Sequence, residues 1–165
     1  MPLIPLTPLI PLTPRMSLIA LATAHEATIA DLEASLFKRP FTADALTSLF
    51  ASPAFVGYAL ADEAGDIMSY ILMNQVLDEA EILSLGTARV QQSKGYACQL
   101  LNATCALLLD RGVCRIYLDV AESNLPARAL YAGCGFGESG RRPGYYGAAP
   151  HRQDAIIMSK PLDGH

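Results

Sequence analysis

The sequence predicts a mixed α/β domain in which helices cover both faces of a central sheet. Two β-rich runs, "AFVGYAL" and "DIMSYILMNQ", flank the turn segment "ADEAG" and should pair as an antiparallel hairpin. A strand candidate at 79–88 continues into a glycine loop and a helical pattern, and residues 113–120 return to strand character. Two strands joined by a helical crossover lie parallel. The sheet should therefore be mixed and mostly antiparallel.

Length and composition limit the possible functions. A chain of 165 residues is one ordinary domain, and 52% hydrophobic with 17% charged residues fits a compact protein in the cytoplasm. The net charge of −4 gives no basic field for nucleic acid, and no apolar run reaches the roughly 20 residues that span a membrane. The four cysteines form no CxxC pair and have no histidine at zinc spacing, so we expect reduced, mostly buried thiols and no metal.

The first residues differ from the rest. The hexapeptide "LIPLTP" occurs twice, with proline at every third position, which favours an extended or polyproline-like chain. We therefore expect residues 1–16 to form an extended tail outside the fold, and residues 17–165 to form a single domain. The tail could bind a partner, or it could be a translated upstream extension with Met16 as the biological start.

Two helices should open the domain. Thr23 and Glu26 have the capping-box spacing and precede an apolar stripe, which predicts a helix over 24–37. "RPF" interrupts this helix, and Thr42 can cap a second short helix that ends before "SP". His25 and His151 show no partner pattern and are expected at the surface.

The second half alternates helices with strands. The helix after the glycine loop should end at Arg111-Gly112, where a cation and a glycine suit a C-terminus. Asn124 should begin a further helix that ends at Gly133 and Gly135. The segment "GRRPGYYGAAPHR" reads as a loop between the last two strands, the second of which is "DAIIMSK".

The glycine loop "QQSKGYACQLL" is a candidate anion site. Where a strand runs through a loop into a helix, the first turn presents unpaired amides and the positive end of the helix dipole. Gly95 can adopt positive φ and allows close approach to the backbone. Residues 92–98 could thus hold a pyrophosphate, although a glycine before a helix also serves simple turn chemistry. No Walker or GxGxxG pattern is present.

Two motifs together resemble a known superfamily. Q-x-x-G-x-A at 92–97 is followed by N-x-x-x-x-A-L-Y-x-x-x-G-F at 124–136. This pattern resembles the Gcn5-related N-acetyltransferase (GNAT) superfamily. The segments "VLDEAEIL", "ESNLPARALYAGCGF" and "DAIIM" look like the bacterial ribosomal-protein-alanine N-acetyltransferase branch. The likeness runs from about Val76 to Leu162.

The resemblance implies a GNAT-type fold with a splayed parallel strand pair and acetyl-CoA as co-substrate, without a metal. It implies an acceptor that is a protein or peptide N-terminus, such as a ribosomal protein, and we expect a monomer or weak dimer without nucleic-acid or membrane partners. The residues implied to contact the coenzyme are Leu85, Gly86, Thr87, Ser93, Lys94, Gly95, Tyr96, Ala97, Cys98 and Asn124. Those implied to contact the acceptor are Glu81, Arg141, Arg142, Tyr145 and Tyr146.

The same resemblance implies two catalytic residues. Asp119 occupies the position of the family's glutamate base, and because aspartate is one methylene shorter a water could relay the proton. Glu81 is the second candidate base. Tyr131 matches the proton donor near the coenzyme sulfur, although a tyrosine here could also pack in the core. Asn124 could contact the coenzyme or simply cap its helix.

Two departures leave the substrate open. Aspartate replaces the family's glutamate, and "FKRPF" at 37–41 stands where the family often has Phe-Pro-Trp; the chain contains no tryptophan. The alternatives are a small-molecule or lysine amine as acceptor, and a non-catalytic module that binds or senses acyl-CoA. Arg141 and Arg142 argue against a polycationic acceptor.

Overall fold

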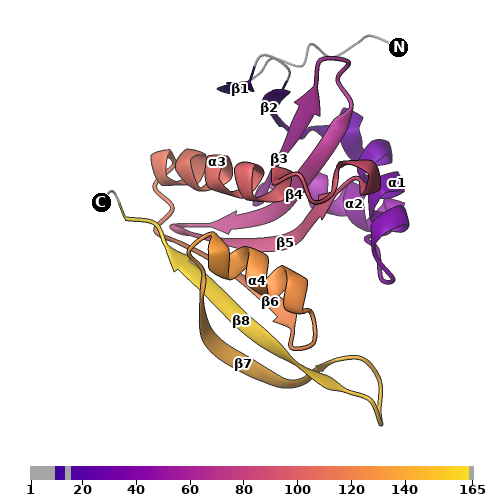
Figure 1. The fold of residues 1–165 in the computed structure, drawn as a ribbon, viewed down its shortest axis with the longest axis vertical. Coiled ribbons are helices and arrows are strands. Elements are labelled where there is room, and N and C mark those ends of the chain that lie inside the picture. The colour runs from indigo at the N-terminus through magenta and orange to yellow at the C-terminus, as the bar shows by residue number, and fades with distance from the viewer. Residues whose placement is uncertain (1–9, 14–15, 164–165) are drawn as a thin grey trace. The chain divides into compact units, whose positions relative to one another are not determined.

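The computed structural model describes residues 10–13 and 16–163, and divides into two compact units (Figure 1). Unit 1 contains residues 1–74 and 83–104, and unit 2 contains residues 75–82 and 105–165. Three elements belong to both units, the strand β4 (Ile67–Val76), the strand β5 (Glu79–Thr87) and the helix α3 (Tyr96–Asp110). Each unit is therefore described by itself.

The strands of unit 1 follow the order β1-β2-β3-β4-β5. The hairpin predicted around Gly65 is confirmed as β3 (Phe55–Asp62) and β4 (Ile67–Val76), which pair antiparallel. Gly65 has φ 86°, the left-handed conformation that glycine adopts without penalty. The strand β2 (Met16–Ala20) pairs antiparallel with β3, a pairing that the sequence pattern did not reveal.

Four residues of the proline-rich segment form β1 (Ile10–Thr13), which pairs antiparallel with β2. Met16, the last residue of the expected tail, begins β2, and residues 1–9 and 14–15 lie outside the described residues. Within the described part of the chain, no helix is long and apolar enough to cross a membrane.

The helices of unit 1 are η1 (Thr23–His25), α1 (Glu26–Leu36) and α2 (Ala43–Ala51). The Thr42 cap of α2 is confirmed, since its Oγ1 accepts from the Ala45 amide at 3.1 Å. The capping box expected at Thr23 and Glu26 is wrong. Instead the Nδ1 of half-buried His25 accepts from the Ala22 amide at 2.9 Å, so His25 is not the partnerless surface residue expected.

The core of unit 1 forms where α1 and α2 meet the strands. Ile29 from α1 and Leu46 from α2 are fully buried and join a cluster with β2, β3 and β4. The strand members of the cluster are Ile19, Ala59, Ala61, Ile67, Tyr70 and Leu72. These side chains fix the strands beneath the helices.

The strand β5 and the helix α3 follow in chain order, as predicted, and the short helix η2 (Arg89–Gln91) lies between them. The predicted end of α3 is also confirmed. Gly112 has φ 85°, and the Val113 amide donates to the Leu108 carbonyl at 3.0 Å, which closes the helix with a Schellman-type contact.

Unit 2 has the strand order β5-β6-β8-β7, with β6 at Arg115–Ala121, β7 at Gly137–Tyr146 and β8 at Gln153–Pro161. The predicted parallel pair is confirmed, because Glu79–Glu81 of β5 lie in parallel register with Arg115–Tyr117 of β6. The strand β8 pairs antiparallel with both β6 and β7. The helix α4 (Leu125–Gly133) connects β6 to β7.

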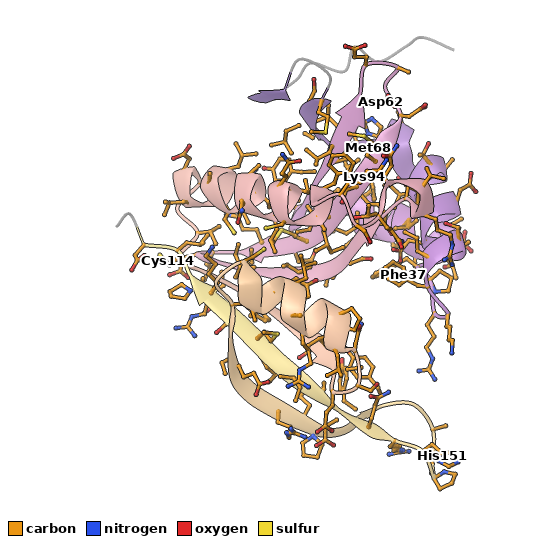
Figure 2. All side chains as sticks on the ribbon, viewed as in Figure 1. Phe37, Asp62, Met68, Lys94, Cys114 and His151 are labelled. Atoms are coloured by element: carbon orange, nitrogen blue, oxygen red, sulfur yellow. The ribbon has the colours of Figure 1, made fainter. Side chains whose placement is uncertain are left out.

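One expected loop is a strand. Most of "GRRPGYYGAAPHR" belongs to β7, which ends its unit's strand order and pairs with β8 from Gly137 to Tyr146. The register shifts between Arg142 and Tyr146, where Pro143 and Gly144 lie. An edge strand with an irregularity tolerates proline and glycine, which hid this strand in the sequence. Figure 2 shows His151 at the tip of the β7–β8 hairpin.

The described residues include all four cysteines, and none of these forms a disulfide, as expected. Cys105 and Cys134 are buried, Cys98 is half-buried and Cys114 is exposed.

Candidate functional site

The loop between β5 and α3 in unit 1 has an unusual backbone. Ser93 has φ 65° and Gly95 has φ 83°, so two nearby residues adopt the left-handed conformation. Side chains hold the loop in this shape. Gln92 Nε2 donates to the Thr87 carbonyl at 3.0 Å, and Lys94 Nζ donates to Gln91 Oε1 at 3.2 Å.

The amides of this loop are open. From Ser93 to Ala97 the backbone N–H groups donate to no group within residues 10–13 and 16–163, and the Gln99 amide donates to the Gly95 carbonyl at 3.1 Å. A Cβ at Gly95 would meet no atom within 4 Å. Open space therefore lies against a row of donors at the positive end of a fifteen-residue helix. These residues fit the pyrophosphate of a coenzyme.

Gly86 and Thr87, two of the β5 residues expected to contact the coenzyme, are in contact with side chains of β4. Ser69 Oγ donates to the Gly86 carbonyl at 3.0 Å and lies 3.1 Å from Thr87 Oγ1. A Cβ at Gly86 would lie 2.7 Å from ring carbons and the hydroxyl of Tyr70. Glycine is therefore required at this point because Tyr70 packs directly against the strand.

In unit 2, one face of the sheet gathers the expected catalytic carboxylates. Burial alternates along β6, so Tyr117 and Asp119 point to the same, more open face. The register places Glu81 of β5 beside Tyr117. Arg142 of β7 approaches from the other side, and its Nε lies 3.3 Å from Asp119 Oδ1. The Asp119 side chain is 15% exposed and that of Arg142 is 52% exposed.

Titration shifts on this face reflect burial and crowded negative charge. The pKa of Glu81 is raised, chiefly by burial and then by Asp119, against the opposing effect of Arg142. Burial also raises the pKa of Tyr117, with further increments from Glu81, Glu79 and Asp119. The pKa of Tyr146 rises to about 12, again through burial first and Asp119 second. Glu81, Tyr117 and Tyr146 therefore hold their protons more tightly than they would in water.

Tyr131 lies on α4 and is 7% exposed. Its ring packs edge-to-face on Phe136, with centroids 5.6 Å apart. Burial raises the pKa of its hydroxyl well above the ordinary value, with smaller contributions from Cys134 and Tyr146. The hydroxyl has no hydrogen-bond partner among the described residues. The side chain thus combines the packing role with an uncommitted, neutral donor.

Two further expected site residues, Asn124 and Arg141, already have partners within the protein. Asn124 Oδ1 caps α4 by accepting from the Ala127 amide at 3.3 Å. Arg141 contacts Asp154 at 2.7 Å and Glu122 at 3.0 Å, and this contact lowers the pKa of Asp154. Its charge is therefore already neutralised.

Arg142 lies against tyrosines of its own strand. Its Cζ lies 5.6 Å from the centre of the Tyr145 ring, and that ring meets Tyr146 edge-on at 5.0 Å. The three side chains that were expected to receive an acceptor therefore stand together, while Arg141 is directed to Glu122 and Asp154.

Sequence reasoning missed two residues of this face, Tyr117 and Glu79. The signal was present, because both fall in period-2 register with Asp119 and Glu81 along their strands. A third missed residue is Glu33 of α1, a buried carboxylate in unit 1 whose partners come from distant segments.

Comparison with known proteins identifies the family. The sequence profile of the Acetyltransferase (GNAT) family matches residues 25–136, more than half of the chain. The chain belongs to the GNAT family.

The relatives and solved structures agree with this membership. The [ribosomal protein bS18]-alanine N-acetyltransferase of Escherichia coli is 36% identical to this GNAT chain over 98 residues, which cover 59% of the chain and 66% of that relative, slightly under two thirds. The crystal structure of the Escherichia coli ribosomal-protein-alanine N-acetyltransferase superposes with TM-score 0.83 and 27% identity, covering 91% of this chain and 96% of that one.

A spermidine N-acetyltransferase from Vibrio cholerae, crystallised with CoA and spermine, superposes with TM-score 0.76 and 24% identity. That match covers 91% of this chain and 97% of the other, and it shows the shared fold.

Gly86→Ala tests the packing of Tyr70 against the GNAT strand. The new methyl group would overlap the Tyr70 ring, and overpacking of this kind costs about 1–3 kcal/mol of unfolding free energy. Urea denaturation should show this loss. The control is Gly133→Ala near the end of α4, where a Cβ meets nothing within 4 Å and stability should hold or rise. Equal stability of Gly86→Ala and the wild type would contradict the packing.

Proposed function

We propose that this protein is an N-acetyltransferase that transfers the acetyl group of acetyl-CoA to a primary amine, most favourably the N-terminal α-amine of a protein. The observation that carries the proposal is the open row of amides from Ser93 to Ala97 in a member of the GNAT family. Such a row suits a diphosphate bound at a helix N-terminus. Acetyl-CoA supplies the acetyl group as a thioester.

Unit 1 would hold the coenzyme. The amides from Ser93 to Cys98 would bind its pyrophosphate, and Lys94 adds a cation beside them. Backbone groups of Leu85, Gly86 and Thr87 would pair with the pantetheine arm, as the resemblance implies. Asn124 in unit 2 already caps α4 through its oxygen, so only its amide nitrogen remains for a coenzyme contact.

Asp119 would accept the proton that the acceptor ammonium must lose before attack. An α-amine has a pKa of about 8, so most of it is protonated at neutral pH. The carboxylate stays partly exposed and bonds to Arg142 through one oxygen only, at 3.3 Å. The second oxygen can receive a proton directly or through one water. Glu81, which forms no ion pair among the described residues, is the alternative base on the same face.

Tyr131 would donate a proton to the departing sulfur. Its pKa is raised by burial, so the phenol is protonated at any working pH and can act as the acid. Asp119 takes one ammonium proton, and the neutral amine then forms the new C–N bond as the C–S bond breaks and Tyr131 protonates the departing thiolate. The acylated nitrogen loses a second proton to solvent and Tyr131 regains a proton from solvent, so one proton is released for each acetyl group transferred. No acyl-enzyme is required.

The acceptor would approach the face that carries Arg142, Tyr145 and Tyr146. Aromatic rings with a cation–π partner suit the first residues of a peptide, whose backbone supplies carbonyl acceptors. Relatives at 36% identity carry the name ribosomal-protein-alanine N-acetyltransferase, which favours an alanine-first acceptor.

A small cationic amine is the second candidate acceptor. The carboxylates of Glu79, Glu81 and Asp119 share their face with two described arginines, Arg142, which pairs with Asp119, and Arg115, which lies beside Glu79 in the strand register. Arg141 is neutralised by Glu122 and Asp154. Arg141 therefore contributes little repulsion toward a polyamine.

Release of free thiol from acetyl-CoA separates the candidates. We expect release with an alanine-first peptide and little with the same peptide blocked at its α-amine. Release only with polyamines or lysine would favour the second candidate. Coenzyme binding without turnover on any amine would contradict catalysis and favour a sensing module.

Tyr131→Phe tests the proposed acid. Loss of the hydroxyl should lower kcat by about 10²–10⁴-fold, the usual contribution of a positioned acid, while the ring packing on Phe136 is kept. Steady-state kinetics and calorimetry with acetyl-CoA measure the two effects. The coenzyme Kd should change little. An unchanged kcat would remove Tyr131 from the reaction.

Asp119→Asn tests the proposed base through pH. The loss of kcat/KM should be largest below about pH 8, where the α-amine carries a proton that must be removed, and should shrink at pH 9.5. Glu81→Gln is the matched carboxylate control and should give a flatter profile. If Glu81→Gln shows the pH-dependent loss of kcat/KM and Asp119→Asn shows the flatter profile, Glu81 is the base. A loss equal at both pH values would indicate a structural defect.

A further inference from the structure

Unit 1 contains a buried carboxylate that the proposed reaction does not use. Glu33 of α1 is 1% exposed, and acidic residues are almost never buried to this degree unless paired. Its partners are hydrogen-bond donors from three other segments. Tyr70 Oη and Ser84 Oγ both donate to Oε2, the latter at 2.7 Å, and the Phe41 amide donates to Oε1 at 3.1 Å.

These three donors explain why the position holds an acid. An ionised carboxylate is an acceptor at both oxygens, so it can satisfy two hydroxyls and one amide without a competing donor of its own. Tyr70 stays a neutral donor, because burial first and Glu33 second raise its pKa. A charge-assisted bond to each donor is stronger than one between neutral groups.

Glu33 is linked in two ways to β5, the strand whose residues 85–87 are proposed to contact the coenzyme. Ser84 lies on β5 directly before Leu85, the first residue proposed to contact the pantetheine arm. The Tyr70 ring packs against Gly86, with its hydroxyl at 2.7 Å from where a Cβ would stand. The carboxylate therefore fixes both residues that border this part of the strand.

A further contact ties the same end of α1 to the loop that precedes the open amides. Arg89 of η2 donates through Nε and Nη2 to the Ser35 carbonyl, at 3.1 and 2.6 Å. The end of α1 thus holds the coenzyme strand through Glu33 and the following η2 through Ser35.

We propose that Glu33 is a positioning residue that sets the backbone of Leu85–Thr87 for the coenzyme through its bonds to Ser84 and Tyr70. The inference rests on the proposed function, since it concerns the same coenzyme. Glu33 touches no reacting atom in this account. It acts through the strand alone.

Ser84→Ala is the informative variant, because removing Glu33 would leave the buried Tyr70 hydroxyl and two half-buried donors unpaired and could prevent folding. The change deletes one hydroxyl that faces Glu33. The dissociation constant for acetyl-CoA, measured by calorimetry, should rise about threefold to tenfold, as expected for one lost hydrogen bond to a charged group. Ser84→Thr keeps the donor and should restore the wild-type value.

Thr47→Ala is the matched control. Thr47 Oγ1 lies 3.0 Å from both the Glu26 carboxylate of α1 and the Ala43 carbonyl of α2, and can donate its one proton to either. The variant therefore deletes a hydroxyl that faces a carboxylate of α1 without touching β5. Its acetyl-CoA affinity should equal that of the wild type. A general weakening of unit 1 would lower affinity in both variants, whereas positioning through Ser84 affects only one.

Hydrogen exchange of the coenzyme-free protein provides a second readout. The amides of Leu85–Thr87 should exchange faster in Ser84→Ala than in the wild type. Their exchange rates in Thr47→Ala should equal those of the wild type. If the wild type binds acetyl-CoA and Ser84→Ala binds it equally well, with equal exchange, the positioning role is overturned and the proposed function stands. If the wild type binds no acetyl-CoA, the proposed function itself is overturned.

Discussion

The open amides from Ser93 to Ala97 are the constraint on which the functional account depends. A helix begins with unpaired donors by necessity, but this loop adds two left-handed residues and side-chain ties that hold the donors in one arrangement. A glycine with nothing within 4 Å of its missing Cβ keeps that arrangement accessible. A turn into a helix already requires the positive φ at Gly95 and leaves the first amides unpaired. In the proposed function a bound diphosphate would occupy these amides.

The chemistry proposed for unit 2 depends on crowded negative charge beside the half-exposed cation Arg142. Glu81, Asp119 and their neighbours share a face where burial raises the pKa of Glu81 and of two tyrosines. Arg142 balances only part of this charge, through one long contact to Asp119 and a ring contact to Tyr145. Exposed pairs of this type contribute little to stability, so an incoming ammonium can replace the guanidinium at small cost. The face is suited to receive a cation and remove its proton.

Local sequence signals predicted the elements whose ends are fixed by their own residues. Thr42 caps α2, and Gly112 ends α3, as the sequence indicated, because each needs only neighbours within a few positions. The order of strands and helices from β3 onward followed from apolar periodicity. The edge strand β7 was predicted as a loop, because its residues are not typical of a strand and it is held in strand conformation by pairing with β8. Glu33 could not be found at all. Its partners are 8, 37 and 51 residues away, and only the fold brings them to one carboxylate.

The central claim is that main-chain nitrogens at the start of α3 bind a diphosphate, and backbone NMR tests it most directly. Titration with CoA should shift the amide resonances from Ser93 to Ala97, while pantetheine, which lacks the diphosphate, should leave them in place. Shifts of these resonances with CoA but not with pantetheine would support the account. If CoA binds and these amides do not respond, the coenzyme is held elsewhere and the account is wrong.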